Sequence, residues 1–367
     1  YIEHERIDGC VPISPGEEDI ICVEEICPYT SPDCISNLFS KTSLAAPFLA
    51  SAKQELIIST TATDYEAVDS FIDSKIAELY NSPTDLEYLT IIASAYAIQK
   101  SKQEWYIRFI MPGFIPICSA LDPYVYADII GEDHDPDVGV GRVMGFDISD
   151  VSSYIARVLF YTDILPTSER TFMKYMASPF NIPGLPEYGE VQVEEWASIF
   201  NDYDYDAVSK SDEQGNFTSE DWEYQDLIHW IDHGNHDWAG IDDDEIPLLD
   251  ESLVIAYASL TCSRSDECSF WANAIRQGAV GFAGAVSVAC TRDKTYIDML
   301  NNLYCLENNY PEVGKAFSEA YYEEFWSPPG CTLSARYMQT YIGDPTFSLN
   351  PPNLLMEELP SYLPSCD

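Results

Sequence analysis

The sequence predicts an α/β fold around a parallel sheet, because segments of strand and helix character alternate in two parts of the chain. In the first part, residues 55–60 and 88–93 are apolar segments of strand length. Residues 64–80 between them place apolar side chains at helical spacing, and Asp64 stands at the expected N-cap. This strand–helix–strand order is typical of a βαβ unit, in which the two strands run parallel.

The same alternation returns in the second half of the chain. A predicted helix at 270–276 is followed by Gly278, a residue suited to ending a helix. The polar and aromatic stretch 166–222 gives no assignment. The further predicted elements are helices at 150–163, 296–306 and 313–325 and strands at 227–231, 253–260 and 279–286.

Composition and charge narrow the class of protein. The chain has 367 residues, of which 46% are hydrophobic, so it can form a substantial core and is not intrinsically disordered. Its formal charge is −44, from 62 acidic and 18 basic residues, which argues against nucleic acid and anionic membranes as partners. Such acidity is typical of proteins in high salt or acidic surroundings, and it also suits a cationic substrate. The longest apolar run, 279–290, is too short to span a membrane.

The chain has 11 cysteines, which indicates an oxidising, extracellular or cell-surface setting. Four of them lie in the first 34 residues, within a loop-rich arm (residues 1–44) that needs disulfides for stability. An odd number leaves at least one thiol free if all bonds are intramolecular, and Cys262 is the predicted free thiol. Buried, reduced cysteines are the alternative. Residue 1 is Tyr, so we expect the chain to be a processed product or a fragment, without any signal peptide.

Two strand ends carry the residues with the chemistry of a cysteine hydrolase. His233 follows the predicted strand 227–231, and Cys262 follows the predicted strand 253–260. Side chains at the carboxyl ends of neighbouring parallel strands lie together at one edge of the sheet. The imidazole can accept the thiol proton and later protonate a leaving amine. The backbone N–H groups of Gly234 and Cys262 are suited to stabilise the oxyanion of a tetrahedral intermediate.

Four further stretches follow one another in order over residues 50–350. They are Tyr124–Gly131 with Asp133–His134 and Val140–Arg142; His233–Asn235 with Trp238–Gly240; Ala258–Ser263 with Phe270–Ile275 and Gly278–Gly284; and Tyr341–Thr346. Together they resemble the gingipain family of cysteine peptidases, within the caspase-like fold group. In order, they are similar to the family's strand–turn–Gly-Arg segment, its His-Gly block, its Cys block with the following helix and strand, and its terminal Gly-Asp-Pro strand. Asn235 stands where the family usually has Ser, and the family's aromatic lining is not evident around Ser287–Asp293.

The resemblance implies a caspase-like parallel-sheet sandwich of two side-by-side α/β subdomains, with a catalytic dyad in the second. On this basis Cys262 is the nucleophile and His233 the general acid/base of a secreted cysteine endopeptidase, which cleaves proteins or peptides through an acyl-enzyme. The expected division is a cysteine-rich arm at 1–44, a first subdomain at 45–155, a second subdomain at 156–350 and a tail at 351–367.

An acidic residue at the base of the substrate pocket would select Arg or Lys at the cleavage site. Glu187 or Glu190, before the His233 strand, is the candidate for this position. The alternative is a solvated surface role, because most glutamates of so acidic a chain face water.

Two oxygen-rich turns are candidate cation sites. Asp133, Asp135 and Asp137 form one, and residues 242–245 form the other. Either can hold a structural Ca²⁺, although neither has the spacing of an EF-hand and solvated loops are the simpler interpretation. The peptide chemistry itself requires no cofactor.

Two other functions are compatible with the sequence. His229, His233 and His236 would offer zinc ligands if their segment were helical, but Trp230 stands where the zinc-peptidase motif needs Glu. The second alternative is a non-catalytic extracellular surface or assembly protein built on the same peptidase fold. The presence of both His233 and Cys262 argues against it, since an inactive protein needs neither.

Overall fold

The computed structural model describes residues 10–12, 20–22, 43–60, 65–79, 86–94, 126, 137–164, 172–177, 191, 193–194, 196–198, 201, 206–211, 218–231, 237–238, 241–242, 245–249, 251–257, 270–285, 312–325 and 339–348.

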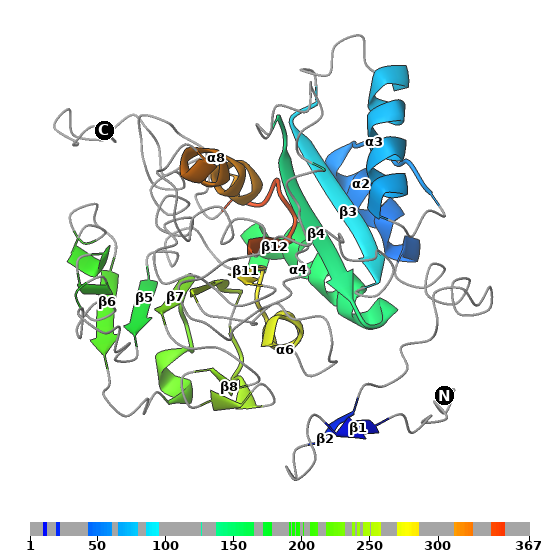
Figure 1. Cartoon of the computed structure of the whole chain (residues 1–367). Helices are drawn as coiled ribbons and strands as arrows, with labels where there is room; N and C mark the ends of the chain where they lie inside the picture. Colours follow the sequence, from blue (N-terminus) through cyan, green and yellow to red (C-terminus); the bar gives the residue numbers. More distant parts are fainter. Residues whose placement is uncertain are drawn as a thin grey trace, which may run out of the picture.

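An eight-stranded mixed sheet organises the fold (Figure 1). Neighbouring strands in this sheet run parallel, except that β11 and β12 are antiparallel. In spatial order the strands are β3 (Tyr88–Ser94), β4 (Gly139–Gly145), β12 (Gln339–Gly343), β11 (Gly281–Ala285), β10 (Leu253–Tyr257), β7 (Leu227–Ile231), β5 (Phe172–Ala177) and β6 (Asp206–Ser211). Two small antiparallel pairs are separate from it: β1 (Cys10–Pro12) with β2 (Ile20–Cys22), and β8 (Asp237–Trp238) with β9 (Ile241–Asp242).

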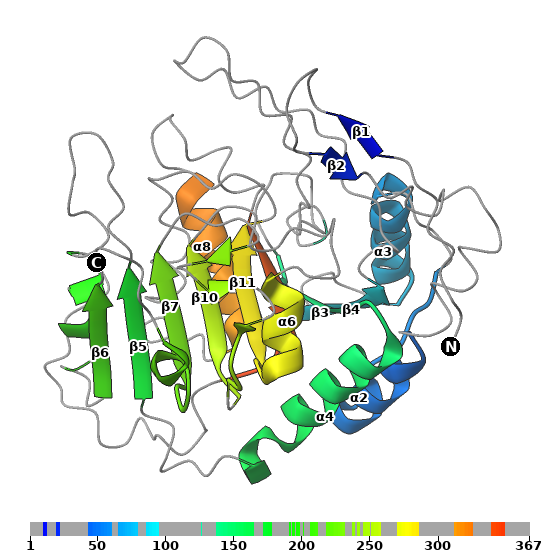
Figure 2. The ribbon, with the colours of Figure 1, turned by 90° about the horizontal axis from the view of Figure 1, so that it is seen from below.

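Helices cover both faces of the sheet (Figure 2). α6 (Phe270–Gln277) lies on one face and α8 (Val313–Phe325) on the other. α4 (Ile148–Ile164) lies beside α6, and α2 (Ala46–Lys53) lies beside α4. α3 (Tyr65–Leu79) is the remaining long helix of the described residues, and the short 3-10 turns are η1 (Ser43–Ala45) and η4 (Ser219–Asp221).

Buried apolar side chains form two clusters. The larger one joins the central strands to α4, α6 and α8, with Ile228, Val254, Trp271 and Phe317 among its members. The smaller one joins α3 to β4 and the residue preceding it, through Val68, Ile72, Ile76, Val138 and Val140. Because helices lie on both faces of a mostly parallel sheet, the predicted α/β class is confirmed.

Most of the predicted elements in the described residues are confirmed. The strands predicted at 88–93, 227–231, 253–260 and 279–286 correspond to β3, β7, β10 and β11, although β10 is described only to Tyr257. The helices predicted at 64–80, 150–163, 270–276 and 313–325 correspond to α3, α4, α6 and α8. The helix predicted at 296–306 lies outside the described residues. The division into subdomains at 45–155 and 156–350 stays a prediction. Helix α4 runs through residue 155, and one sheet continues from β4 to β12.

The prediction of a buried strand at 55–60 is wrong. These residues form no strand, and Leu56 and Ile57 are 61% and 47% exposed. β3 is the edge of the described sheet on this side and pairs with β4 alone. A run of apolar residues has strand propensity, but it becomes a strand only where a neighbouring strand is available.

Three strands of the eight-stranded sheet escape the sequence-based assignment. β5 and β6 lie within the polar and aromatic stretch 166–222. β4 is rich in glycine, which weakens strand propensity, yet all seven of its residues are buried. Gly141 permits a close approach to β12, because a Cβ there would lie 2.4 Å from the carbonyl oxygen of Gly343. The requirement for glycine is therefore tertiary and leaves no local signal.

Candidate active site

Strands β7 and β10 lie side by side, run parallel and are in register. Leu227 pairs with Leu253 and Ile231 pairs with Tyr257, so the described strands begin and end together. Every residue of β7 is buried. The expectation that neighbouring parallel strands precede the histidine and the cysteine is therefore confirmed.

The chain beyond these strands carries the candidate dyad. His233 comes two residues after Ile231 and Cys262 five residues after Tyr257, and both lie outside the described residues, as does Gly234. Adjacent strands are about 4.8 Å apart, while two and five residues extend at most about 7 Å and 18 Å. Chain length therefore allows both side chains to reach the edge of the sheet at which parallel strands collect ligands.

The other candidate site residues also fall largely outside the described part of the chain. Glu187, Asp133 and Asp135 lie there, whereas Asp137 is partly buried just before β4. Within the residues that the structure describes, no group of three or more His, Cys, Asp or Glu side chains is arranged to hold a metal ion. The calcium site stays a prediction.

His229 lies in the middle of β7 and has no exposed surface. The segment that carries it is a strand, so the helical arrangement on which the zinc interpretation depends is wrong. Burial lowers the pKa of His229 to about 3, because the charged imidazolium would lose its hydration. His229 is therefore a neutral core residue at pH 7.

Helix α6 begins at Phe270 and follows the segment that carries Cys262, residues 258–269, which in turn follows the described part of β10. At the other end of α6, Gly278 has a φ of 128°, which favours glycine. The N–H of Gly278 donates to the Ile275 carbonyl (3.3 Å), and that of Ala279 donates to the Ala274 carbonyl (2.9 Å). This pair of bonds is a Schellman motif, which satisfies two of the last carbonyl groups of the helix.

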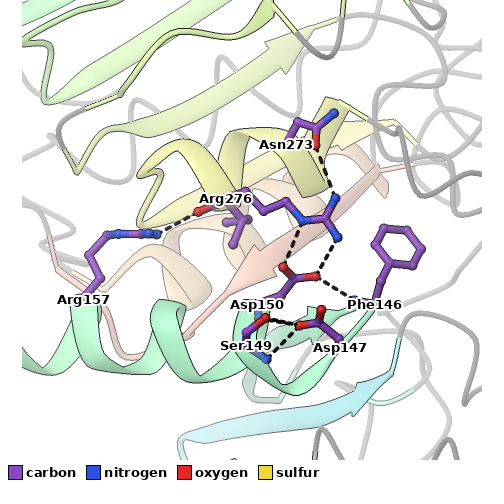
Figure 3. A network of polar contacts seen from close by, with 8 residues as sticks. Phe146, Asp147, Ser149, Asp150, Arg157, Asn273 and Arg276 are labelled. Atoms are coloured by element: carbon purple, nitrogen blue, oxygen red, sulfur yellow. Dashed lines mark hydrogen bonds and ion pairs between the residues drawn. The ribbon is translucent and has the colours of Figure 1, made fainter. Parts of the chain in front are cut away.

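A network of charged and aromatic side chains joins α6 to the start of α4 (Figure 3). The guanidinium of Arg276 donates to both carboxylate oxygens of Asp150, at 2.9 Å from Nε and 3.0 Å from Nη2. Asp150 also accepts a bond from the backbone N–H of Phe146 (3.0 Å). The Phe146 ring lies 5.6 Å from the guanidinium of Arg276 and stacks on Trp271 at 5.5 Å between centroids.

A second arginine, Arg157 of α4, reaches the end of α6. Nη1 of Arg157 donates to the carbonyl oxygens of Ile275 (2.9 Å) and Ala279 (2.8 Å). The start of α4 is fixed separately, because the Asp147 carboxylate accepts bonds from the N–H groups of Ser149 (2.7 Å) and Asp150 (3.0 Å). The hydrogen bond from the Ser149 hydroxyl is the main reason that the pKa of Asp147 is lowered.

Sequence reasoning did not single out Asp150, Arg157 or Arg276. Asp150 is an acid in the first turn of one helix and Arg276 a base in the last turn of another, which suits the helix dipoles, whereas Arg157 in the middle of α4 has no such signal. The bidentate partners are 126 residues apart, so only the folded chain brings them together.

The Gly-Asp-Pro stretch is a buried turn after β12. Asp344 has no exposed surface, and its carboxylate accepts bonds from the backbone N–H (3.0 Å) and hydroxyl (2.9 Å) of Thr346. Its backbone N–H donates to the hydroxyl oxygen of Tyr154 (2.6 Å), which in turn donates to the carbonyl of Val280 (2.8 Å). Burial raises the pKa of Tyr154 well above its ordinary value, so this phenol stays protonated. The turn therefore has a structural role: through Tyr154, its hydrogen bonds join the end of β12 to α4 and to Val280.

Comparisons with known proteins agree with this architecture. The sequence model of peptidase family C25 matches residues 50–350. The chain is similar in structure to the Arg-specific cysteine proteinase gingipain R (RGPB), at 17% identity and a TM-score of 0.61 over 77% of this chain and 68% of that chain. The complex of Porphyromonas gingivalis RgpB pro- and mature domains gives 15% identity and a TM-score of 0.60 over 77% of this chain and 70% of that chain. A structure described as a protease gives 13% identity and a TM-score of 0.64 over 85% of this chain and 77% of that chain.

No curated protein matches the sequence. At these identities the structural likeness shows the fold alone, and it confirms the caspase-like, gingipain-like α/β architecture. Because the family model covers most of its length, the chain belongs to peptidase family C25, the gingipain family of cysteine peptidases.

Proposed function

We propose that the chain is a cysteine endopeptidase in which His233 and Cys262 form the catalytic dyad. The observation that carries this proposal is the parallel, in-register pairing of β7 with β10, which directs the two following segments to one edge of the sheet. Membership of family C25 supports the reaction class, and the spacing of the two residues after their strands supports their assignment.

In the proposed reaction the Cys262 thiolate attacks the carbonyl carbon of the scissile peptide bond. The N–H groups of Gly234 and Cys262 donate to the oxyanion that forms. The imidazolium of His233 then protonates the leaving amine as the C–N bond breaks, which leaves a thioester on the enzyme. Water, deprotonated by His233, attacks the thioester and releases the acid and the thiol.

For substrate preference we propose Glu187 at the base of the pocket, with Arg or Lys before the cleaved bond. A carboxylate there would pair with a guanidinium or an ammonium group. Cleavage of a random peptide mixture, with the products sequenced by mass spectrometry, tests this directly. Glu187→Gln is expected to weaken the preference, whereas cleavage only after apolar or acidic residues would contradict it.

The setting that we propose is outside the cell or at its surface, in keeping with the 11 cysteines. Among the described residues, no helix combines the length and the apolar character needed to cross a membrane. Asp133, Asp135 and Asp137 are proposed to bind a structural Ca²⁺. A rise in the melting temperature with added Ca²⁺, abolished in Asp135→Asn, would support that site.

The proposed dyad is tested by covalent labelling with a peptide that carries a thiol-directed group. Peptide mapping should find the label on Cys262, and both labelling and cleavage should be lost in His233→Ala. Cys262→Ala should abolish cleavage, while Cys118→Ala serves as the matched control and keeps it. Folded protein that neither labels at Cys262 nor cleaves peptides would instead support a non-catalytic surface or assembly protein.

A further inference from the structure

We infer that Asp150, Arg157 and Arg276 are positioning residues, which hold the segment that carries Cys262 by fixing helix α6 on helix α4. The inference rests on the proposed function of Cys262 and adds residues that the dyad does not include. The residues from 258 to 269 join β10 to α6 and contain Cys262. The position of this segment depends on both of its ends.

The end at β10 is fixed by the sheet. β10 pairs with β7 on one side and with β11 on the other, and Leu253–Ala256 are buried. The end at α6 lies on a helix of eight residues, and a helix of this length is not stable by itself in water. Tertiary contacts must therefore hold α6 in place, and five of its residues are buried in the larger apolar cluster.

Besides these apolar contacts, α6 is held at both ends by α4 and by Phe146, which lies just before α4. At the first turn of α6, Trp271 stacks on Phe146. At its last turn, Arg276 makes the bidentate pair with Asp150 (Figure 3). Arg157 adds two hydrogen bonds to the carbonyls of Ile275 and Ala279. A displacement of α6 would thus move the end of the segment that carries Cys262.

Such a displacement would affect the reaction far more than the stability of the fold. The side chain of Arg276 is 36% exposed, and a partly exposed ion pair contributes little to stability. Catalytic geometry is less tolerant, since a displacement of about 1 Å can lower a rate about 100-fold. A large loss of rate with little loss of stability would therefore distinguish positioning from a merely structural role.

The test compares Asp150→Asn, Arg276→Gln and their double variant with the wild type. Asn is nearly isosteric and can still accept the bond from Phe146, but its amide group cannot complete the bidentate pair. The matched control is Asp221→Asn, because Asp221 pairs with Lys210 at 2.6 Å and accepts a bond from the N–H of Thr218. The two pairs are also alike in exposure, at 32% and 11% for Lys210 and Asp221 against 36% and 10% for Arg276 and Asp150.

The measurements are kcat and KM on a peptide substrate, the rate and pH profile of Cys262 alkylation by iodoacetamide, and the urea midpoint. We expect each single variant and the double variant to lower kcat by the same factor, about tenfold or more, with KM within about twofold. Alkylation at pH 7 should slow in parallel, and Arg276→Lys should restore part of the rate. The control variant should change the urea midpoint as much as the test variants do, but leave kcat unchanged.

Unchanged kcat and alkylation in the Asp150 and Arg276 variants of an active enzyme would overturn this inference alone. A wild-type chain whose cleavage activity does not depend on Cys262 would overturn the proposed function, and this inference with it. The wild type and Cys262→Ala, measured first, separate the two outcomes.

Discussion

The ammonium group of Lys53 lies 2.6 Å from a carboxylate oxygen of Asp344, whose side chain has no exposed surface. Lys53 is the last residue of α2, and Asp344 belongs to the turn that follows β12. Lys53 also hydrogen-bonds the hydroxyl of Thr346. One ion pair thus joins an early helix to the last described turn of the chain.

Replacing Lys53 with Met should lower the free energy of unfolding by about 3 kcal/mol, because it leaves a buried carboxylate without its cation. Urea unfolding followed by tryptophan fluorescence measures the change. Lys75→Met is the control: it removes an exposed pair with Glu78 and should cost less than about 0.5 kcal/mol. Equal effects of the two substitutions would show that the Lys53–Asp344 pair contributes no more to stability than an exposed pair does.

Replacing Gly314 with Ala should destabilise the protein, although the same change usually favours a helix. A Cβ on Gly314 would lie 2.3 Å from the Cβ and 2.6 Å from the Cα of Pro345, so α8 or the turn must move. We expect a loss of about 2–3 kcal/mol, more than the gain of about 1 kcal/mol in helix propensity. Thermal unfolding measures it, and Glu319→Ala on the same helix should change stability by less than about 0.5 kcal/mol. A stabilised Gly314→Ala variant would contradict the close approach.

His229 should make the protein less stable in acid. Its pKa is about 3 in the folded chain, below the ordinary value of 6.5, so below pH 6.5 the unfolded chain binds a proton that the folded chain lacks. The resulting loss in the free energy of unfolding is absent above pH 6.5 and grows as pH falls toward 3, with a slope of up to about 1.4 kcal/mol per pH unit. His229→Gln should remove this slope.

Urea unfolding of both proteins between about pH 7 and about pH 4 gives the comparison. The difference in stability between wild type and variant should change steadily below pH 6.5, to the disadvantage of the wild type. Parallel curves would mean that the histidine titrates normally in the folded chain. Because only the difference is read, the general effect of acid on the other charges cancels.

The protein should become more stable as salt is added. With a net charge of −44, the acidic side chains of the folded chain repel one another, and salt ions screen this repulsion. Between about 0.1 M and 1 M salt the screening length falls from about 10 Å to about 3 Å. The melting temperature should therefore rise by several degrees, and equally for NaCl and KCl. A fall in the melting temperature would indicate that attractive ion pairs outweigh the repulsion.

The sequence by itself determined the elements whose pattern is local. The segments 227–231 and 313–325, which form β7 and α8, could be predicted from their own residues. The first is an apolar run of strand length, and the second has apolar residues at helical spacing. The alternation of strand and helix segments along the chain also predicted parallel strands ahead of His233 and Cys262. The dyad itself stays a prediction that rests on strand order and family membership.

The tertiary structure alone decided which segments become neighbours. It left 55–60 without a strand partner, inserted β12 between β4 and β11, and paired Asp150 with Arg276 and Lys53 with Asp344. None of these relations has a local signature, because each depends on groups that are far apart in the chain and meet only when the sheet assembles. The sequence gives the chemistry of each side chain, but the distance between two side chains depends on how the whole chain packs.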